Sequence, residues 1–212
     1  MTDKIKDQLI EMLIEHSRAI YSIISDMGVF YVTWAENSKS NRDLLEKKVT
    51  KLKFDVEEAA SIKNRTIKTF SEVLTFGSGD WAILIHRMNN LSNVALRFID
   101  LLRYIDLNNV DPEMKDLYHR SINKILEMEK LINESIKLLR ENPRNIIINI
   151  NMIHELGNYT ETVFHQFLNY LYKDKKLEIR DLLIIRDTVV TLEQFVDKVN
   201  HIAEIIRVLN YE

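Results

Sequence analysis

Glycine and proline are so scarce in this chain that long, uninterrupted helices are the structure it can most readily form. The 212 residues include 4 glycines and 2 prolines, well below the average usage of about 7% and about 5%. Apolar residues recur every three or four positions along almost the whole sequence, which is the spacing of one face of an α-helix. The sequence therefore predicts an all-α protein with few turns.

Six helices are expected, because polar or helix-breaking segments interrupt this periodicity five times. Two of the breaks place a proline in the first turn of a helix directly after a capping residue, in the pairs Asp111-Pro112 and Asn142-Pro143. Short loops between long helices favour antiparallel neighbours in a bundle. The helices are expected to span about residues 4–34, 40–74, 80–106, 112–140, 143–172 and 178–209.

The chain also resembles two copies of one unit. Each half holds three of the expected helices, which predicts a first three-helix repeat at residues 1–108 and a second at 109–212, packed as one compact domain. The segments RMNNLSNVALRFIDLL and VTLEQFVDKVNHIAEII fall at equivalent places in the two halves. A duplicated helical scaffold is therefore expected.

The two equivalent segments differ in the charge of one residue pair. The first carries Asn89 and Asn93, whereas the second carries Glu193 and Asp197 at matching places. The members of each pair are four residues apart, so on a helix they are expected on a single face. One half therefore carries carboxylates where the other carries neutral amides.

Composition excludes several classes of function. A net charge of -3 argues against a general nucleic-acid surface. The absence of cysteine excludes disulfides, thiol catalysis and cysteine-ligated metal centres, and it fits a cytosolic protein. The most hydrophobic uncharged stretch, MGVFYVTWA, is about half of the ~20 residues that a membrane-spanning helix needs. The chain is thus expected not to be integral to a membrane, although it could dock on one.

The second half offers side chains that could bind a metal ion. Glu161 and His165 are four residues apart on one expected helix, and Glu193, Asp197 and His201 follow the same spacing on the next. Carboxylates and imidazoles from facing helices can hold iron, manganese or zinc. The alternative is an ordinary solvated helix face, which carries the same residue types. No Glu-x-x-His pair of a ferritin-like centre, phosphate-binding glycine loop or nucleophile elbow accompanies these residues.

Two further features could form docking sites. Lys47, Lys48 and Lys51, with the neighbouring Lys53, make a basic cluster that is either a solvated face or a contact for an anionic partner. The aromatic stretch MGVFYVTW at the end of the first helix is the second candidate. The remaining histidines are scattered and are interpreted as structural or surface residues, and these are His16, His86, His119 and His154.

Two segments, EEAASIKNRTI and FGSGDWAILIHRMNNLSNVA, resemble the PhoU-like family of Pit accessory proteins, also called phosphate transport regulators. In that family the second helix typically reads Glu-Ala-Asp-x-Ile, and the third helix reads Leu-Asp-Asp-Ile-x-Asp. The C-terminal half ends in Leu-Glu-x-x-x-Asp, which is present here from Leu192 to Asp197. The resemblance covers roughly the whole chain through the order and spacing of these motifs.

The resemblance implies two tandem three-helix bundles whose acidic motifs ligate multinuclear iron or zinc clusters. This chain departs from that pattern at most acidic positions. Ala60 replaces the Asp of the second helix, and Gly157 replaces the first acid of the fifth. The acidic positions of the third helix are occupied by neutral amides, and these are Asn89, Asn90 and Asn93.

A neutral amide keeps the shape of a carboxylate but loses the charge that binds a hard cation. The first half is therefore predicted to have little cation affinity. Glu193 and Asp197 match the family motif in full, and Glu161 stands at one further acidic position. A residual site for a divalent or iron ion is predicted there, and a full cluster is not expected.

By resemblance, the chain is predicted to be a cytoplasmic, non-enzymatic regulatory protein of phosphate transport or phosphate homeostasis. Its expected partner is a low-affinity inorganic phosphate transporter, contacted peripherally at the inner face of the membrane. Two alternatives stay open at this point. One is a metal-binding bundle or metalloenzyme that uses the C-terminal residues, and the other is a structural helical module that forms homo-oligomers.

Overall fold

The computed structural model describes residues 3–36, 41–73, 79–140, 143–173 and 177–211. Within these ranges the chain forms six α-helices and one short 3-10 helix, which confirms the all-α prediction. The α-helices are α1 (Asp3–Ala35), α2 (Asn41–Val73), α3 (Gly79–Leu102), α4 (Pro112–Leu138), α5 (Pro143–Lys173) and α6 (Ile179–Leu209), and the 3-10 helix is η1 (Leu107–Asn109).

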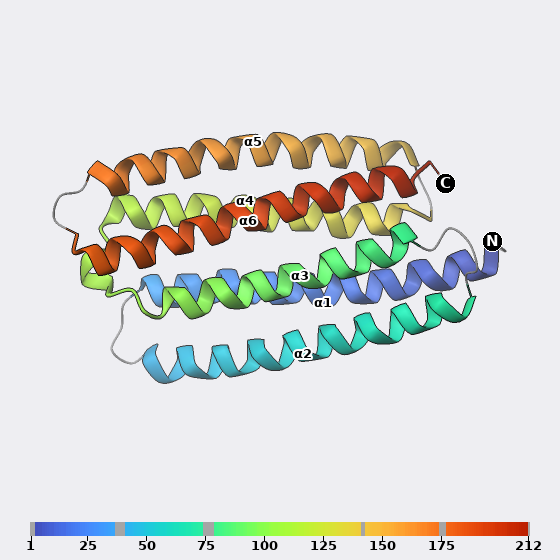
Figure 1. Ribbon diagram of the computed structural model, residues 1–212, viewed down its shortest axis with the longest axis horizontal. Helices are drawn as coiled ribbons and strands as arrows, with labels where there is room; N and C mark the ends of the chain where they lie inside the picture. Colours follow the sequence, from blue (N-terminus) through green and yellow to red (C-terminus); the bar gives the residue numbers. More distant parts are fainter. Residues whose placement is uncertain (1–2, 37–40, 74–78, 141–142, 174–176, 212) are drawn as a thin grey trace.

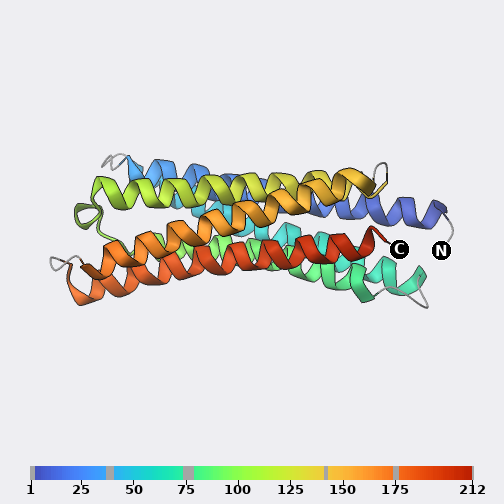
Figure 2. The ribbon, with the colours of Figure 1, turned by 90° about the horizontal axis from the view of Figure 1, so that it is seen from above.

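The helices form a bundle with four inner and two outer members. Each of the inner helices α1, α3, α4 and α6 packs against three other helices, because α1 contacts α3 and α4 while α6 contacts the same two. Helix α2 covers α1 and α3 on one side, and α5 covers α4 and α6 on the other (Figure 1). Seen from above, α1 and α4 run side by side along the whole bundle (Figure 2). The core therefore lies between the four inner helices.

Tyr118 of α4 occupies the centre of this core at one end of the bundle. Its ring contacts Phe167 of α5 in an edge-on arrangement, with ring centroids 4.7 Å apart. Phe98 of α3 and Trp34 of α1 also contact the Tyr118 ring. The Tyr118 hydroxyl forms a buried hydrogen bond with Thr188 of α6. One side chain thus contacts four helices, and aromatic pairs of this kind stabilise a core beyond the area they bury.

Polar contacts at both ends fix the alignment of α1 and α4. At one end, the Tyr31 hydroxyl donates to the Lys115 carbonyl at 2.6 Å, and Lys115 Nζ donates to the Ala35 carbonyl at 3.1 Å. At the other, Arg140 Nη2 donates to Glu11 at 3.2 Å. The two helices are therefore antiparallel. Residues of α1 and α4 whose numbers sum to about 150 lie at the same level along the bundle.

The predicted helix boundaries are mostly confirmed. Asp111 accepts a hydrogen bond from the Met114 amide at 2.8 Å, and Pro112 is the first residue of α4, as the sequence predicted. The predicted cap Asn142 lies outside the described residues. The third helix is shorter than predicted, because it ends at Leu102 and not near Asp106. Asp106 instead caps η1 by accepting from the Asn108 amide at 3.0 Å.

The helices are long, but none within the described ranges combines the length and apolar character needed to cross a lipid bilayer. The predicted boundary between the repeats falls within η1, which separates α1, α2 and α3 from α4, α5 and α6. Helices α2 and α5 take corresponding outer places in the two halves (Figure 1). The duplication itself stays a prediction.

Replacing Asp111 by Ala should destabilise the start of α4. The Asp111 carboxylate accepts hydrogen bonds from the Met114 amide and from the Tyr170 hydroxyl, and the substitution removes both. Loss of an N-cap typically costs about 1 kcal/mol, so the free energy of unfolding in urea should fall by at least that amount. Asp111→Asn keeps a capping oxygen and should retain most of the stability. Equal losses in both variants would contradict the capping role.

Candidate functional site

The first-repeat positions at which the family resemblance implies acids differ in their exposure. Asn89 of α3 is buried, with 6% of its surface exposed. Asn93 is exposed, although it follows Asn89 by four residues. The two side chains share one face of α3, as expected, but Asn89 lies at its buried edge and Asn93 at its exposed edge, because a four-residue step turns the side chain about 40° further around the helix. Ala60 of α2 is half-buried and offers no ligand atom.

Asn89 lies beside His16 of α1, which is fully buried. Burial lowers the pKa of His16 from 6.5 to about 4, while the neighbouring polar side chain of Asn89 acts in the opposite direction. Lys63 of α2 lowers this pKa further, and Glu15 raises it slightly. The imidazole is therefore neutral at physiological pH, and a neutral imidazole and a neutral amide meet in the first repeat where the family resemblance implies charged ligands.

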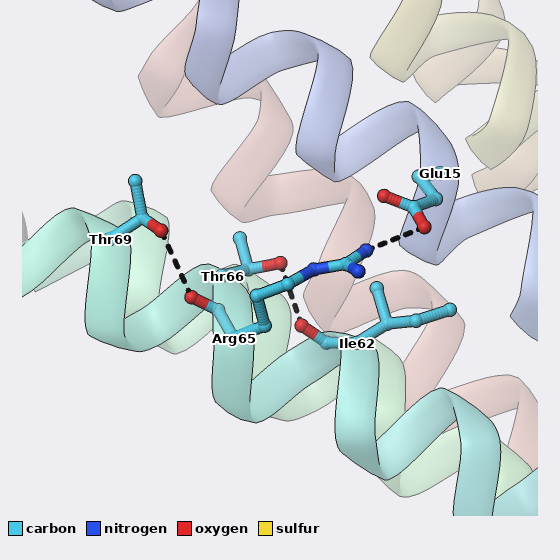
Figure 3. Close-up of polar contacts among 5 residues, drawn as sticks. All are labelled: Glu15, Ile62, Arg65, Thr66 and Thr69. Carbon is cyan, nitrogen blue, oxygen red and sulfur yellow. Dashed lines mark hydrogen bonds and ion pairs between the residues drawn. The ribbon is translucent and has the colours of Figure 1, made fainter.

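Helix α2 is tied to α1 at the level of His16. Arg65 extends from α2 to Glu15 of α1, with 2.6 Å between guanidinium and carboxylate (Figure 3). Next to Arg65, the Thr66 hydroxyl donates to the Ile62 carbonyl at 2.8 Å and is buried, while Thr69 donates to the Arg65 carbonyl at 3.1 Å (Figure 3). The ion pair is exposed and contributes little stability by itself. It does fix the alignment of the two helices over the His16 ring.

Several buried polar side chains gather at this level of the bundle. In the antiparallel alignment of α1 and α4, Ser17 is level with Asn133, and Glu129 lies about one turn away. Glu129 is fully buried, and Asn133 is 6% exposed. We call this set the central polar group, and it comprises His16, Ser17, Asn89, Glu129 and Asn133.

The central polar group is poorly supplied with hydrogen bonds. Within the described part of the chain, both ring nitrogens of His16 and both carboxylate oxygens of Glu129 lack a well-formed partner. The same holds for Ser17 Oγ and for the side-chain oxygens of Asn89 and Asn133 among the described residues. Buried polar atoms are normally paired, and each unpaired one costs free energy. This level is therefore the least apolar part of an otherwise apolar core.

Glu129 is the strongest anomaly in the central polar group. It occupies a core-facing position of α4, in line with Ile122, Ile125, Ile132 and Ile136, each at most 2% exposed. Burial raises the pKa of Glu129 from 4.5 to about 8. At neutral pH the side chain is thus mostly a neutral acid, since a charged carboxylate is strongly disfavoured in an apolar surrounding.

The residues predicted to form a residual metal site lie toward the surface of α5 and α6. Glu161 and His165 approach to 3.9 Å, with 66% and 72% of their side chains exposed. Glu193 is half-buried, while Asp197 and His201 are exposed on α6. Nowhere in the described ranges do three or more acidic, histidine or cysteine side chains come close enough to hold an ion. The metal site at these residues therefore stays a prediction that the geometry does not reinforce.

Gly157 has a steric role that the sequence did not indicate. A Cβ atom at position 157 would lie 2.9 Å from Nδ2 of Asn200 on α6, which is closer than van der Waals contact allows. One turn earlier, His154 Nε2 is 2.6 Å from Glu204 of α6. Asn200 thus occupies the space that an acidic side chain at position 157 would need. Position 157 could hold a carboxylate only if Asn200 moved.

The two predicted docking features differ in exposure. Lys47 and Lys51 are exposed on α2 and Lys48 is half-buried, next to Leu44 and Phe54, of which 46% and 66% are exposed. Lys51 is paired with Asp26 and with Asp55, the latter at 3.5 Å. We call Leu44, Lys47, Lys48, Lys51 and Phe54 the α2 basic face.

The aromatic stretch at the end of α1 is not a docking surface in the expected sense. Phe30, Tyr31 and Trp34 are each at most 4% exposed, because they pack into the core. Only Val29 and Val32 of this stretch are substantially exposed, at 48% and 46%. The aromatic rings of this stretch are therefore not accessible to a partner, and docking at the stretch stays a prediction that depends on Val29 and Val32.

Sequence reasoning missed Glu129 and undervalued His16. Glu129 could have been found, because its spacing to Ile125 and Ile132 places it on the apolar stripe of its helix. His16 carried no such signal, since its burial depends on α2 and α3. Its interpretation as a structural residue agrees with its place in the core.

The two outer and four inner helices define an all-α, PhoU-like bundle. A crystal structure of a PhoU-like phosphate regulatory protein from Shewanella oneidensis MR-1 has the same architecture. It matches with a TM-score of 0.81 and 14% sequence identity over 95% of this chain and 98% of that chain. A second structure, of a PhoU-like protein from the same organism, matches with a TM-score of 0.81 and 14% identity over 96% of this chain and 99% of that chain.

No protein-family model matches the sequence, and no curated protein matches it in sequence. The chain nevertheless has the PhoU-like fold, as its motifs predicted. At this level of identity the structural likeness establishes the fold and leaves the activity to be argued from the residues.

Replacing Glu129 by Gln should remove a pH-dependent loss of stability. Between its ordinary pKa of 4.5 and its raised pKa of about 8, the folded state binds a proton that the unfolded state has released. The free energy of unfolding therefore falls as pH rises through this window, by up to about 1.4 kcal/mol per pH unit. The variant should lack this fall and be more stable than the parent at pH 8, as measured by urea unfolding.

Below pH 6.5, His16 makes the free energy of unfolding rise with pH. Its lowered pKa means that the folded state binds fewer protons than the unfolded state. The two effects nearly cancel between pH 4.5 and 6.5, so the fall due to Glu129 should be visible between pH 6.5 and 8. Glu127→Gln on the exposed face of α4 is the matched control. If Glu129→Gln has the pH profile of this control, Glu129 does not have the raised pKa.

The predicted metal affinity can be measured by elemental analysis of protein purified with and without added iron, manganese or zinc. Any bound ion should be lost in Glu193→Ala and Asp197→Ala, because these residues match the family motif in full. Asn89→Ala and Asn93→Ala should leave the metal content unchanged. Stoichiometric metal that disappears only in the Asn89 or Asn93 variants would contradict the prediction that the first repeat has little cation affinity.

Proposed function

We propose that this chain is a non-enzymatic regulatory protein of inorganic phosphate transport, similar to the Pit accessory proteins. The observation that carries the proposal is the PhoU-like bundle over 95% of the chain, shared with a protein described as a phosphate regulator. The order of the sequence motifs supports the same reading. We place the protein in the cytoplasm, in peripheral contact with a low-affinity phosphate transporter at the inner membrane face.

A binding role, not a catalytic one, fits the distribution of polar residues. The central polar group is buried, and its two titratable members, His16 and Glu129, are mostly neutral at physiological pH. The exposed acids of α5 and α6 form no cluster of three with histidine within the described ranges. A substrate could not reach the first set, and the second set lacks the convergence that general acid-base chemistry requires.

We assign the contact with the transporter to the α2 basic face. Helix α2 is an outer helix, so one whole side of it faces away from the bundle (Figure 1). Lys47 and Lys48 lie between the exposed side chains of Leu44 and Phe54. Lysines flanked by exposed apolar groups suit an acidic loop next to the negatively charged inner surface of a membrane.

The test is co-purification from membranes that contain the transporter, combined with phosphate uptake in cells with and without this gene. Lys47→Glu combined with Lys48→Glu should abolish co-purification and reproduce the uptake defect of the deletion. Arg186→Glu combined with Lys198→Glu, on α6, makes the same charge change elsewhere and should be neutral. Absence of the transporter from the purified fraction, with unchanged uptake in the deletion, would refute the proposed function.

A further inference from the structure

A groove runs between α1 and α4 on a side of the bundle that α2 and α5 leave open. It consists of two adjoining hollows of about 460 Å³ and 420 Å³ that share Tyr31, Val32, Glu36 and His119. Apolar side chains form its middle part, among them Val29, Ile122 and Leu126. The groove therefore offers an apolar surface where two inner helices reach the outside.

The shape of the groove depends on Gly28. A Cβ atom at this position would lie 3.1 Å from Leu126 Cδ1, so the glycine lets α4 approach α1 closely. Val29 and Val32 belong to the α1 wall of the groove, and nearly half of each is exposed. Exposed apolar side chains along a groove of this kind form a surface that a second protein surface can cover.

The two ends of the groove carry opposite charges. Glu36 and Asp116 line one end. Arg18 and Lys130 are exposed beyond the other. Arg18 precedes Glu36 by about five full helical turns, or about 27 Å, so both lie on the same face of α1.

These charges are available for a partner. Lys115, at the acidic end, donates its ammonium hydrogen to the Ala35 carbonyl. Asp116 and Lys130 make long, exposed pairs with Arg120 and Glu134, at 3.6 Å and 3.9 Å. Exposed ion pairs of this kind contribute little to the stability of the fold. The acidic end and the basic end can therefore exchange these contacts for stronger ones.

The charged residues of α1 and α4 lie at matching levels along the groove. Arg18 is nearly level with Lys130, and Glu36 is nearly level with Asp116. The midpoint between the two charges is residue 27 on α1 and residue 123 on α4, and these two residues are also level. A single two-fold axis through this level would place the acidic end of one copy on the basic end of another along both helices.

We propose that this face joins two copies of the chain in an antiparallel dimer around that axis. The axis lays α1 of one copy antiparallel on α1 of the other, so the exposed Val29 and Val32 side chains of both copies pack near the axis and the charged ends pair across the contact. An isologous dimer requires a self-complementary surface, and this face combines exposed apolar side chains near the axis with a charge order that matches itself after the two-fold rotation. The dimer leaves α2 and α5 uncovered, so it is independent of the transporter contact proposed above.

The experiment is sedimentation analysis of the full chain over a range of concentrations and salt. The parent chain should dimerise. Glu36→Lys with Asp116→Lys gives two basic ends, and Arg18→Glu with Lys130→Glu gives two acidic ends. Each of these variants should be monomeric alone, because like charges then meet. An equal mixture of the two should form the dimer again, since every contact then joins opposite charges.

Three further measurements make the outcome decisive. Circular dichroism must show that both charge variants are folded. Val29→Asp should be monomeric and should not be restored by mixing, while Lys53→Glu with Glu57→Lys on α2 should dimerise like the parent. A parent chain that is monomeric throughout, or charge variants that dimerise by themselves, would overturn the proposal. A monomer whose groove binds an amphipathic peptide would overturn it too, by assigning the face to another partner.

Discussion

The fold depends on one shared apolar core, which the four inner helices have to complete together. Each inner helix packs against three others, so its buried surface is wider than the single stripe of an ordinary surface helix. Helices α2 and α5 each pack mainly against two neighbouring helices, so the rest of their surface can carry charged side chains. The difference explains why exposed lysines collect on α2, whereas α1 contributes aromatic residues to the core.

The central polar group lies in the one place where this core is least apolar. A buried polar side chain costs most when its surroundings are wholly apolar. Ser17 and Asn133 share one level of the α1 and α4 alignment, and Glu129 lies about one turn away. These side chains lack hydrogen-bond partners in the described part of the chain, so their burial costs free energy that the surrounding apolar core has to offset.

The sequence predicted the parts of the structure that depend on local signals. Helix type and most boundaries follow from periodicity and from caps such as Asp111, which act within one turn of the chain. The end of α3 was predicted too late, because Asp106 capped a short helix of its own. The motifs identified the PhoU-like fold, since their order and spacing persist even where the acidic residues do not.

The candidate site depended on tertiary neighbours and was harder to predict. Asn89 and Asn93 look equivalent in sequence, but only Asn89 faces the core, because α1 covers that side of α3 and leaves the other open. The groove between α1 and α4 requires the alignment of two helices some 80 residues apart, as shown by the bond from Lys115 to Ala35. Sequence spacing within one helix contains no information on either point.

The replacements in the first repeat are consistent with a single electrostatic requirement. A carboxylate at position 89 would be buried beside His16, and a buried charge needs either an opposite charge or a bound cation. With Ala60 in place of an acid on α2, the carboxylate set that could share such a cation is missing. A neutral amide next to a neutral imidazole avoids the uncompensated charge. The amide at position 89 therefore fits the absence of an acid at position 60, because a carboxylate at position 89 would be a buried charge without a counterpart.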